Sequence, residues 1–246
     1  MHRFFTDDIK NESEQFIITG QDVKHIKNVL RMKQDDEIEI VSDKKSYRCS
    51  IYSIDNDKVI AKILYKNKNN NESPIKIHLF QSLPKSTKME IILQKCTELG
   101  VFSFHPIITE RSIVKIDDKK EIKKLERWKS IVLEAAKQSK RDLVPEVHSI
   151  QRFKEALNGL KNKVIIVPYE LENNLGIKDF LQSIDEIEEV YVFIGPEGGF
   201  EESEIESLIE IGAQIVSLGP RILRTETAGF ITCGVIQYEL GDIGVI

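Results

Sequence analysis

The pattern of apolar residues changes at one polar segment of this 246-residue chain. Residues 66–73 contain only Lys, Asn, Glu and Ser, and Pro74 follows them. A segment of this composition is typical of a linker. Because it separates two different hydrophobic periods, it predicts one domain over residues 1–70 and a second over residues 74–246.

Before the linker, apolar and polar residues alternate in short segments that are rich in β-branched side chains. Alternation with a period of two residues is the pattern of a strand with one buried face. One helix is expected at residues 22–31, and the predicted strands span residues 15–19, 37–41, 47–54 and 58–65. Several short strands with a single helix indicate a small β-barrel domain.

After the linker, predicted strands alternate with segments whose apolar residues recur every three or four positions, as in helices. The strands are expected at residues 75–81, 101–108, 164–167, 190–194 and 214–218. The helices are expected at residues 87–99, 119–140, 201–211 and 226–240. This alternation is typical of an α/β domain with a mainly parallel sheet.

The composition argues against several classes of protein. Cys49, Cys96 and Cys233 are far apart and the five histidines form no metal-ligand motif, so we expect neither a disulfide framework nor a metal. Residues 1–19 lack the apolar core of a secretory signal, and the longest apolar runs are too short to cross a membrane. We therefore expect a cytoplasmic protein with no membrane partner.

Charge is distributed unevenly along the chain, whose net charge is −5. Residues 111–141 contain eleven Lys or Arg and five Asp or Glu, whereas residues 161–210 contain three and thirteen. One basic and one acidic surface suit an enzyme that binds a polyanion with the first and another ligand with the second. Two solvated faces explain the charges equally well.

Three loops follow predicted strands of the α/β domain: P-Y-E at residues 168–170, G-P-E-G-G-F at 195–200 and G-P-R-I-L-R-T-E-T-A at 219–228. Ligands of open α/β sheets bind at the carboxyl ends of the strands, so we expect these loops to line one pocket. A glycine-rich loop before a helix can bind phosphate. This loop, however, lacks the P-loop lysine and the G-x-G-x-x-G spacing, and several glutamates in and after it would repel an anion.

A cofactor with a positive charge and no phosphate suits the acidic loops better. S-adenosylmethionine is a sulfonium compound whose adenine and ribose need apolar walls and backbone hydrogen bonds. The side chains placed to form such walls are Ile194, Leu218, Ile222 and Leu223. The alternative is that the glycines and prolines only make tight turns between strands and helices.

The chain also resembles a known family in motifs that occur in order along it. The second domain contains L-P-K at residues 83–85, Q-K-C-T-E-L-G-V at 94–101, E-R-S at 110–112, E-A-A-K-Q-S at 134–139, G-P-E-G-G-F at 195–200 and R-I-L-R-T-E-T-A at 221–228. The first domain contains M-H-R-F-F at residues 1–5 and H-I-K-N-V-L-R at 25–31. Together they resemble the ribosomal RNA small subunit methyltransferase E family over almost the whole chain, and the last two motifs of the second domain are the most specific pair.

This resemblance implies a fold, a cofactor and a reaction. The family belongs to the SPOUT class of S-adenosylmethionine-dependent methyltransferases, in which a C-terminal trefoil knot forms the cofactor pocket, and its N-terminal domain is a PUA-like RNA-binding β-barrel. Its reaction is methylation of N3 of one uridine of 16S ribosomal RNA in the 30S subunit. Asp35 stands where the family has a turn glycine, and Glu201 where Ser or Thr would cap a helix, a loss of about 1 kcal/mol.

Uracil N3 carries a proton at neutral pH, so the enzyme must accept this proton, stabilise the resulting anion or align the base. Arg224 is the candidate for stabilising the anion or holding the RNA. Glu197 and Glu226 are candidates for accepting the proton or a hydrogen bond, although Glu226 could simply favour the helix dipole. The residues expected to contact the cofactor are Val167, Pro168, Ile194, Gly195, Pro196, Gly198, Leu218, Gly219, Ile222, Leu223, Thr227 and Ala228.

The residues expected to contact RNA combine charge with aromatic or polar side chains. For the phenylalanines near the N-terminus, anchoring the first strand in the core is an equally open role. The expected contacts in the first domain are Arg3, Phe4, His25 and Arg31. In the second domain the family resemblance implies that Lys85, Lys95, Arg111, Gln138 and Arg141 face the substrate.

The last predicted helix carries small residues, which let helices approach closely, and the corresponding helix of this class packs in a dimer. We therefore expect a homodimer that binds 16S ribosomal RNA. Two other functions stay open: a methyltransferase of the same fold that acts on another RNA, and a non-catalytic ribosome-assembly factor that binds RNA. The acidic loop disfavours a nucleotide-dependent α/β enzyme.

Overall fold

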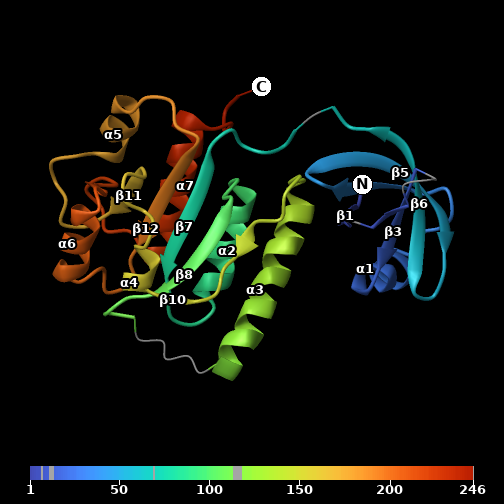
Figure 1. The fold of residues 1–246 in the computed structure, drawn as a ribbon, viewed down its shortest axis with the longest axis horizontal. Helices are drawn as coiled ribbons and strands as arrows, with labels where there is room; N and C mark the ends of the chain where they lie inside the picture. The colour runs from blue at the N-terminus through green and yellow to red at the C-terminus, as the bar shows by residue number, and fades with distance from the viewer. Residues whose placement is uncertain (7, 11–13, 69, 113–117, 246) are drawn as a thin grey trace. The chain divides into compact units, whose positions relative to one another are not determined.

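The computed structural model describes residues 1–6, 8–10, 14–68, 70–112 and 118–245 (Figure 1). The chain forms two compact units. The first comprises Met1–Glu72 and Ala136–Leu143, and the second comprises Ser73–Ala135 and Val144–Ile246.

The first unit contains one mainly antiparallel sheet with the strand order β1-β4-β5-β6-β3-β2, in which only β1 and β4 pair in parallel. The strands are β1 (Arg3–Phe5), β2 (Ile9–Lys10), β3 (Gln15–Thr19), β4 (Glu37–Ser42), β5 (Lys45–Ile54) and β6 (Lys58–Lys66). Helix α1 (Gln21–Lys24) continues as a π-helical turn, His25–Val29, so the predicted helix is shorter and less regular than expected.

Alternation along these strands places one set of side chains in the core of the first unit, as the sequence pattern predicts. The core consists of Phe4, Phe16, Ile18, Val23, Ile26, Ile38, Ile40, Cys49, Ile51, Val59 and Ala61. The turn before β4 forms without glycine, because Asp35 itself takes a φ of +72° and donates its backbone N–H to the Ile51 carbonyl at 2.8 Å. Aspartate enters this left-handed region more readily than most residues.

Arg3 lies inside the first unit, where its side chain is 2% exposed. Its guanidinium donates to the carbonyls of Lys140 and Arg141, both at 2.6 Å, to Asp142 Oδ1 at 3.0 Å and to Glu39 at 3.2 Å. Breaking a buried ion pair by removing one partner is strongly destabilising. The structure therefore gives Arg3 a structural role in place of the expected RNA contact.

The second unit is built on a parallel sheet with the order β10-β8-β7-β12-β11-β13, and β9 also pairs with β8. Its strands are β7 (Lys76–Ser82), β8 (Ser103–Ile108), β9 (Glu146–Val147), β10 (Gln151–Arg152), β11 (Ile165–Pro168), β12 (Glu189–Ile194) and β13 (Gln214–Val216). The predicted α/β class with a mainly parallel sheet is thus confirmed, and β9 and β10 are additions to the prediction.

Helices cover both faces of this sheet (Figure 1). On one face, buried residues of α2 (Lys88–Glu98), α3 (Asp118–Gln138), α5 (Ile177–Ser183) and α7 (Thr225–Leu240) form the larger core cluster. On the other face, α4 (Phe153–Ala156) and α6 (Glu202–Glu210) contribute to a second cluster. The knot that the family resemblance implies stays a prediction. Among the residues that the structure describes, no helix is long and apolar enough to span a membrane.

Aromatic and imidazole rings stack across β12, β7 and β8 and onto His148, which follows β9, on the second face of this sheet. Phe193, Phe80, His105 and His148 form a continuous column with centroid separations of 4.4, 4.2 and 4.1 Å. Burial lowers the pKa of His105 to about 3, and the neighbouring imidazoles add to this effect. The folded sheet therefore holds His105 neutral over the pH range in which a histidine of the unfolded chain becomes protonated.

This depressed pKa predicts a loss of stability in weak acid. Below the unfolded-state pKa of about 6.5, only the unfolded chain gains the proton on His105, so stability falls as the pH decreases, by about 2 kcal/mol at pH 5. His105→Phe keeps the ring column but removes the titration, and it should reduce the stability difference between pH 7 and pH 5 in urea unfolding. His25→Phe, at an exposed position, should retain the full difference. Equal pH dependence of the two variants would refute this account.

Candidate active site

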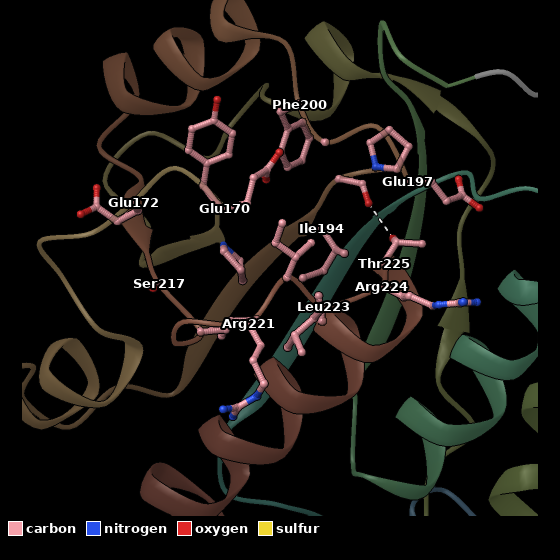
Figure 2. A pocket seen from close by; sticks show the side chains of 18 of the residues that line it. Glu170, Glu172, Ile194, Glu197, Phe200, Ser217, Arg221, Leu223, Arg224 and Thr225 are labelled. Carbon is pink, nitrogen blue, oxygen red and sulfur yellow. Dashed lines mark hydrogen bonds between the residues drawn. The ribbon is translucent and has the colours of Figure 1, made fainter.

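The three glycine- and proline-rich loops meet at the carboxyl ends of β11, β12 and β13. Backbone hydrogen bonds join the first and third loops: Tyr169 donates to the Val216 carbonyl at 3.0 Å, and Ser217 donates to the Leu175 carbonyl at 2.8 Å. The hydroxyl of Thr225, the first residue of α7, donates to the Gly195 carbonyl at 2.6 Å and so joins the second and third loops (Figure 2). Hydrogen bonds thus connect the three loops that form the walls of the pocket expected from the sequence.

These loops enclose a cavity of about 600 Å³, a volume within the range of small-molecule sites. Figure 2 shows Ile194 and Leu223 near its centre, with the carboxylates of Glu170 and Glu197 on loops around them. The expected residues that line the cavity are Pro168, Ile194, Gly195, Pro196, Glu197, Gly198, Leu218, Gly219, Ile222, Leu223, Arg224 and Ala228.

Three expected site residues do not line the cavity. Val167 is fully buried within β11, Thr227 points elsewhere on α7, and Glu226 reaches the site only through an ion pair with Lys88. Four residues that line the cavity lie outside the three expected loops: Lys88, which the family resemblance places toward the substrate, and Glu172, Asn173 and Ser217, which had no expected role. Seven others belong to the expected loops but were not assigned a contact individually: Tyr169, Glu170, Gly199, Phe200, Pro220, Arg221 and Thr225. Tyr169 and Glu170 belong to the first loop, so their place in P-Y-E was the available signal.

Lys88, the first residue of α2, lies between two carboxylates of the site. Its ammonium is 3.0 Å from Glu197 and 3.2 Å from Glu226. The hydrogen bond to Glu197 raises the pKa of Lys88 more than burial lowers it, and the hydrogen bond to Glu226 adds to the rise. Lys88 therefore stays charged and links the glycine-rich loop to the first turn of α7.

Glu197 is held as a carboxylate by its surroundings. Burial raises the pKa of Glu197, but backbone N–H groups, including that of Lys85 at 3.0 Å, and the Lys88 ammonium together lower it below its ordinary value. A carboxylate with a lowered pKa is a weaker proton acceptor. This arrangement favours Glu197 as a fixed negative charge over Glu197 as a general base.

Arg111 fixes the second loop from outside the cavity. Its guanidinium donates to both carboxylate oxygens of Glu201, at 2.7 and 3.0 Å, and to the Gly198 carbonyl at 2.8 Å. Glu201 in turn begins α6 in a capping box with Glu204, whose carboxylate accepts from the Glu201 N–H at 2.9 Å and from the Glu110 N–H at 3.0 Å. The Glu204 carboxylate thus satisfies one N–H at this helix start, and the cost of about 1 kcal/mol expected for the missing Ser or Thr cap at Glu201 stays a prediction.

Gly199 has the tightest backbone requirement of the second loop. Its φ is +69°, and a Cβ built on it would lie 2.4 Å from Glu170 Oε1. Only glycine therefore lets the Glu170 carboxylate lie directly over this loop at the cavity edge. Gly198 is different, because its nearest neighbour would be the Arg111 side chain at an ordinary 3.5 Å.

Arg224 precedes α7 at the cavity edge, and its side chain is exposed. Within the described part of the chain, its guanidinium forms no ion pair or hydrogen bond. It is therefore free to meet an anionic ligand, in contrast to Lys88 and Arg111, which already have carboxylate partners.

The residues expected to contact RNA differ in how accessible they are. Arg3, Phe4 and Arg141 lie in the interior of the first unit, where Arg141 donates to Glu72 at 2.6 Å. Arg111 forms an ion pair with Glu201. The residues with exposed positions are His25, Arg31, Lys85, Lys95 and Gln138. The described residues contain no cluster of three or more potential metal ligands.

Comparison with known proteins defines the class of this fold and site. A model described as an RNA methyltransferase domain matches residues 71–237, and one described as an RNA methyltransferase PUA domain matches residues 18–64. The chain thus combines a methyltransferase domain with a PUA domain, as expected for its fold class.

Relatives at the level of whole chains identify the family. The chain is 39% identical to ribosomal RNA small subunit methyltransferase E of Bacillus subtilis over 97% of both chains. It is 32% identical to the S-adenosyl methionine-bound enzyme of that name from Neisseria gonorrhoeae, with a TM-score of 0.88 over 99% of both chains. A putative methyltransferase from Legionella pneumophila with bound cofactor SAM has the same identity and TM-score over 98% of both chains. This chain belongs to the ribosomal RNA small subunit methyltransferase E family.

Gly199→Ala should destabilise the second unit, because a left-handed conformation costs a non-glycine residue about 1–2 kcal/mol and the new methyl group meets Glu170. Gly198→Ala, at a position with ordinary contacts, is the matched control and should change stability by less than about 0.5 kcal/mol. Urea unfolding of the full chain measures both. In the double variant Gly199→Ala with Glu170→Ala, the steric part of the loss should recover and the backbone part should persist. Equal stabilities of the two single variants would contradict this assignment.

Proposed function

We propose that this chain transfers a methyl group from S-adenosylmethionine to N3 of a uridine of 16S ribosomal RNA in the small ribosomal subunit. The family assignment supports the reaction class and the RNA substrate. The S-adenosylmethionine bound to two similar structures, from Neisseria gonorrhoeae and Legionella pneumophila, supports the cofactor. The observation in this chain that supports the proposal best is the set of carboxylate and apolar side chains that line its cavity.

One side of that cavity suits a cationic ligand without phosphates. Glu170, Glu172 and Glu197 contribute carboxylates on or beside the first two loops, where the ammonium of Lys88 is already paired, whereas the guanidinium groups of Arg221 and Arg224 belong to the third loop. A sulfonium would therefore be attracted to the first two loops, and an anionic group to the third. Apolar walls for the adenine and ribose come from Pro168, Ile194, Leu218, Ile222, Leu223 and Ala228.

The loops of this chain would hold the cofactor and the base in a fixed relation. When bound, S-adenosylmethionine supplies an electrophilic methyl group. The hydrogen bonds between the loops and the ion pairs of Lys88 hold the walls against which the uracil must align. Good alignment of reacting groups can lower the activation barrier by about 7–11 kcal/mol. Alignment is thus assigned the largest share of the rate enhancement.

Arg224 is assigned the second task, which concerns the proton on uracil N3. Transfer of that proton to solvent water leaves negative charge on the O2 and O4 atoms of the base. The exposed, unpaired guanidinium of Arg224 can donate hydrogen bonds to such an anion. Glu197 instead keeps its charge and orients Lys88, and Glu226 shares this role through its own contact with Lys88.

A homodimer is part of the proposal, with RNA contacted by both protomers in the cytoplasm. Helix α7 supports this proposal, because it carries apolar side chains on its exposed side as well as toward the core. Ile231 and Tyr238, two turns apart, are 45% and 66% exposed, and Gly234 lies between them. An apolar stripe of this spacing is typical of a helix that packs against another helix.

Methyl transfer from labelled S-adenosylmethionine tests the proposal directly. Unmodified 30S subunits, free 16S ribosomal RNA and transfer RNA are assayed in parallel, followed by nucleoside analysis. The expected product is 3-methyluridine in 30S subunits. Label in transfer RNA would indicate a different RNA substrate, and bound cofactor without label in any RNA would favour a non-catalytic assembly factor.

Arg224→Ala should lower kcat by about 100-fold, the loss typical for removal of a donor to a developing anion. The affinity for S-adenosylmethionine, measured by calorimetry, should change little. Arg152→Ala is the control, because Arg152 lies on β10 at the opposite edge of the sheet from β13. A variant lacking Arg224 that retains full kcat would remove this residue from the mechanism.

A further inference from the structure

A second hollow, confined to the first unit, carries an excess of positive charge. Its volume is about 630 Å³, and Arg48, Lys66, Lys68 and Lys140 contribute cations to its lining. The one carboxylate in the lining, Glu39, is already bound to Arg3. A cationic hollow is notable in a chain whose net charge is −5.

Three of these cations have no charge partner among the described residues. Arg48 pairs with Glu37, but the ammonium groups of Lys66, Lys68 and Lys140 form no ion pair with any residue that the structure describes. Uncompensated ammonium groups around one concavity attract a polyanion, because their potentials add. None of the three is required for the ionic core around Arg3, which uses only the backbone carbonyl of Lys140.

The backbone around the hollow is fixed by hydrogen bonds. Asn67 donates its N–H to the Ser46 carbonyl at 2.9 Å and its side-chain amide to Ser46 Oγ at 3.0 Å. The carbonyl of Lys140 accepts from Arg3 at 2.6 Å and from the Asn71 side chain at 2.9 Å. The lysine side chains therefore extend from anchored positions, which lowers the entropic cost of holding a ligand.

An aromatic ring stands beside these cations. Tyr65 lines the hollow, is 57% exposed and pairs with Arg48 in the register of β5 and β6. A single-stranded RNA segment offers both matching features, phosphates for the ammonium groups and a base for the exposed ring. An acidic peptide would match only the charge.

We infer that this hollow binds the backbone of a single-stranded RNA segment, with one base on Tyr65. The inference rests on the proposed function for the identity of the polyanion. It moves the RNA contact of the first unit from β1, where Arg3 and Phe4 are buried, to the end of β6 and the segment that contains Lys140.

The test uses the full chain and a fluorescent single-stranded RNA oligonucleotide. In Lys66→Gln with Lys140→Gln, the Kd should rise about tenfold, and the slope of log affinity against log salt should fall by about 1.4, or 0.7 for each phosphate contact. Tyr65→Leu should weaken binding and leave the salt slope unchanged, because it removes stacking without removing charge. Lys24→Gln with Lys62→Gln is the control, with two exposed lysines of the same unit outside the hollow.

The outcomes separate this inference from the proposed function. If the Lys66 and Lys140 variant binds the oligonucleotide like the control, the hollow is not an RNA site, even when methyl transfer to 30S subunits proceeds. If it binds the oligonucleotide normally but loses 30S binding, the hollow meets a ribosomal protein and the inference is overturned. Cofactor affinity should be unchanged in all three variants. Absence of methyl transfer by the unaltered chain would instead refute the proposed function.

Discussion

Strand β11 lies between β12 and β13, and all three run parallel. This pairing brings the carboxyl ends of three neighbouring strands to one edge, and each strand is followed by a loop rich in glycine or proline. The sheet can hold these ends together because Val167, Ile194 and Val216 are buried within it. The cavity, its carboxylates and the start of α7 all depend on this pairing, since none of the loops encloses a ligand-sized space by itself.

Ion pairs at the site decide which charged groups remain available to a ligand. The single positive charge of Lys88 is shared by Glu197 and Glu226, and Arg111 pairs with Glu201. After these pairs have formed, Glu170 and Glu172 on one side of the cavity and Arg221 and Arg224 on the third loop have no ion-pair partner among the described residues. An ordered ion pair fixes geometry more than it adds net attraction. These two carboxylates and two guanidinium groups are therefore the charges that a ligand meets.

Much of this architecture follows from local sequence patterns. Alternation predicts β3, β4, β5 and β6 of the first unit but not the short β1 and β2, and the glycine-rich motifs predict two of the loops. Strands β9 and β10 have two residues each, too few for a period to be recognised. The roles of Arg3 and Arg111 depended on partners more than eighty positions away, Asp142 and Glu201, and no local pattern encodes such a contact. Arg3 beside Phe4 suggested an exposed RNA contact, whereas the fold buries Arg3 against the Asp142 carboxylate.

The segment Ala136–Leu143 completes the first unit, although it is separated in sequence from Met1–Glu72 by more than sixty residues of the second. It brings the carbonyls and the carboxylate that satisfy Arg3, and the Arg141 side chain that satisfies Glu72. Domains usually fold in order as the chain leaves the ribosome. Here the N-terminal unit cannot finish first, because its ionic core is incomplete until residue 143 has been synthesised. A gene fragment that ends at the linker would encode a β-sheet whose buried Arg3 keeps only Glu39 of its partners and loses Asp142 and two carbonyls.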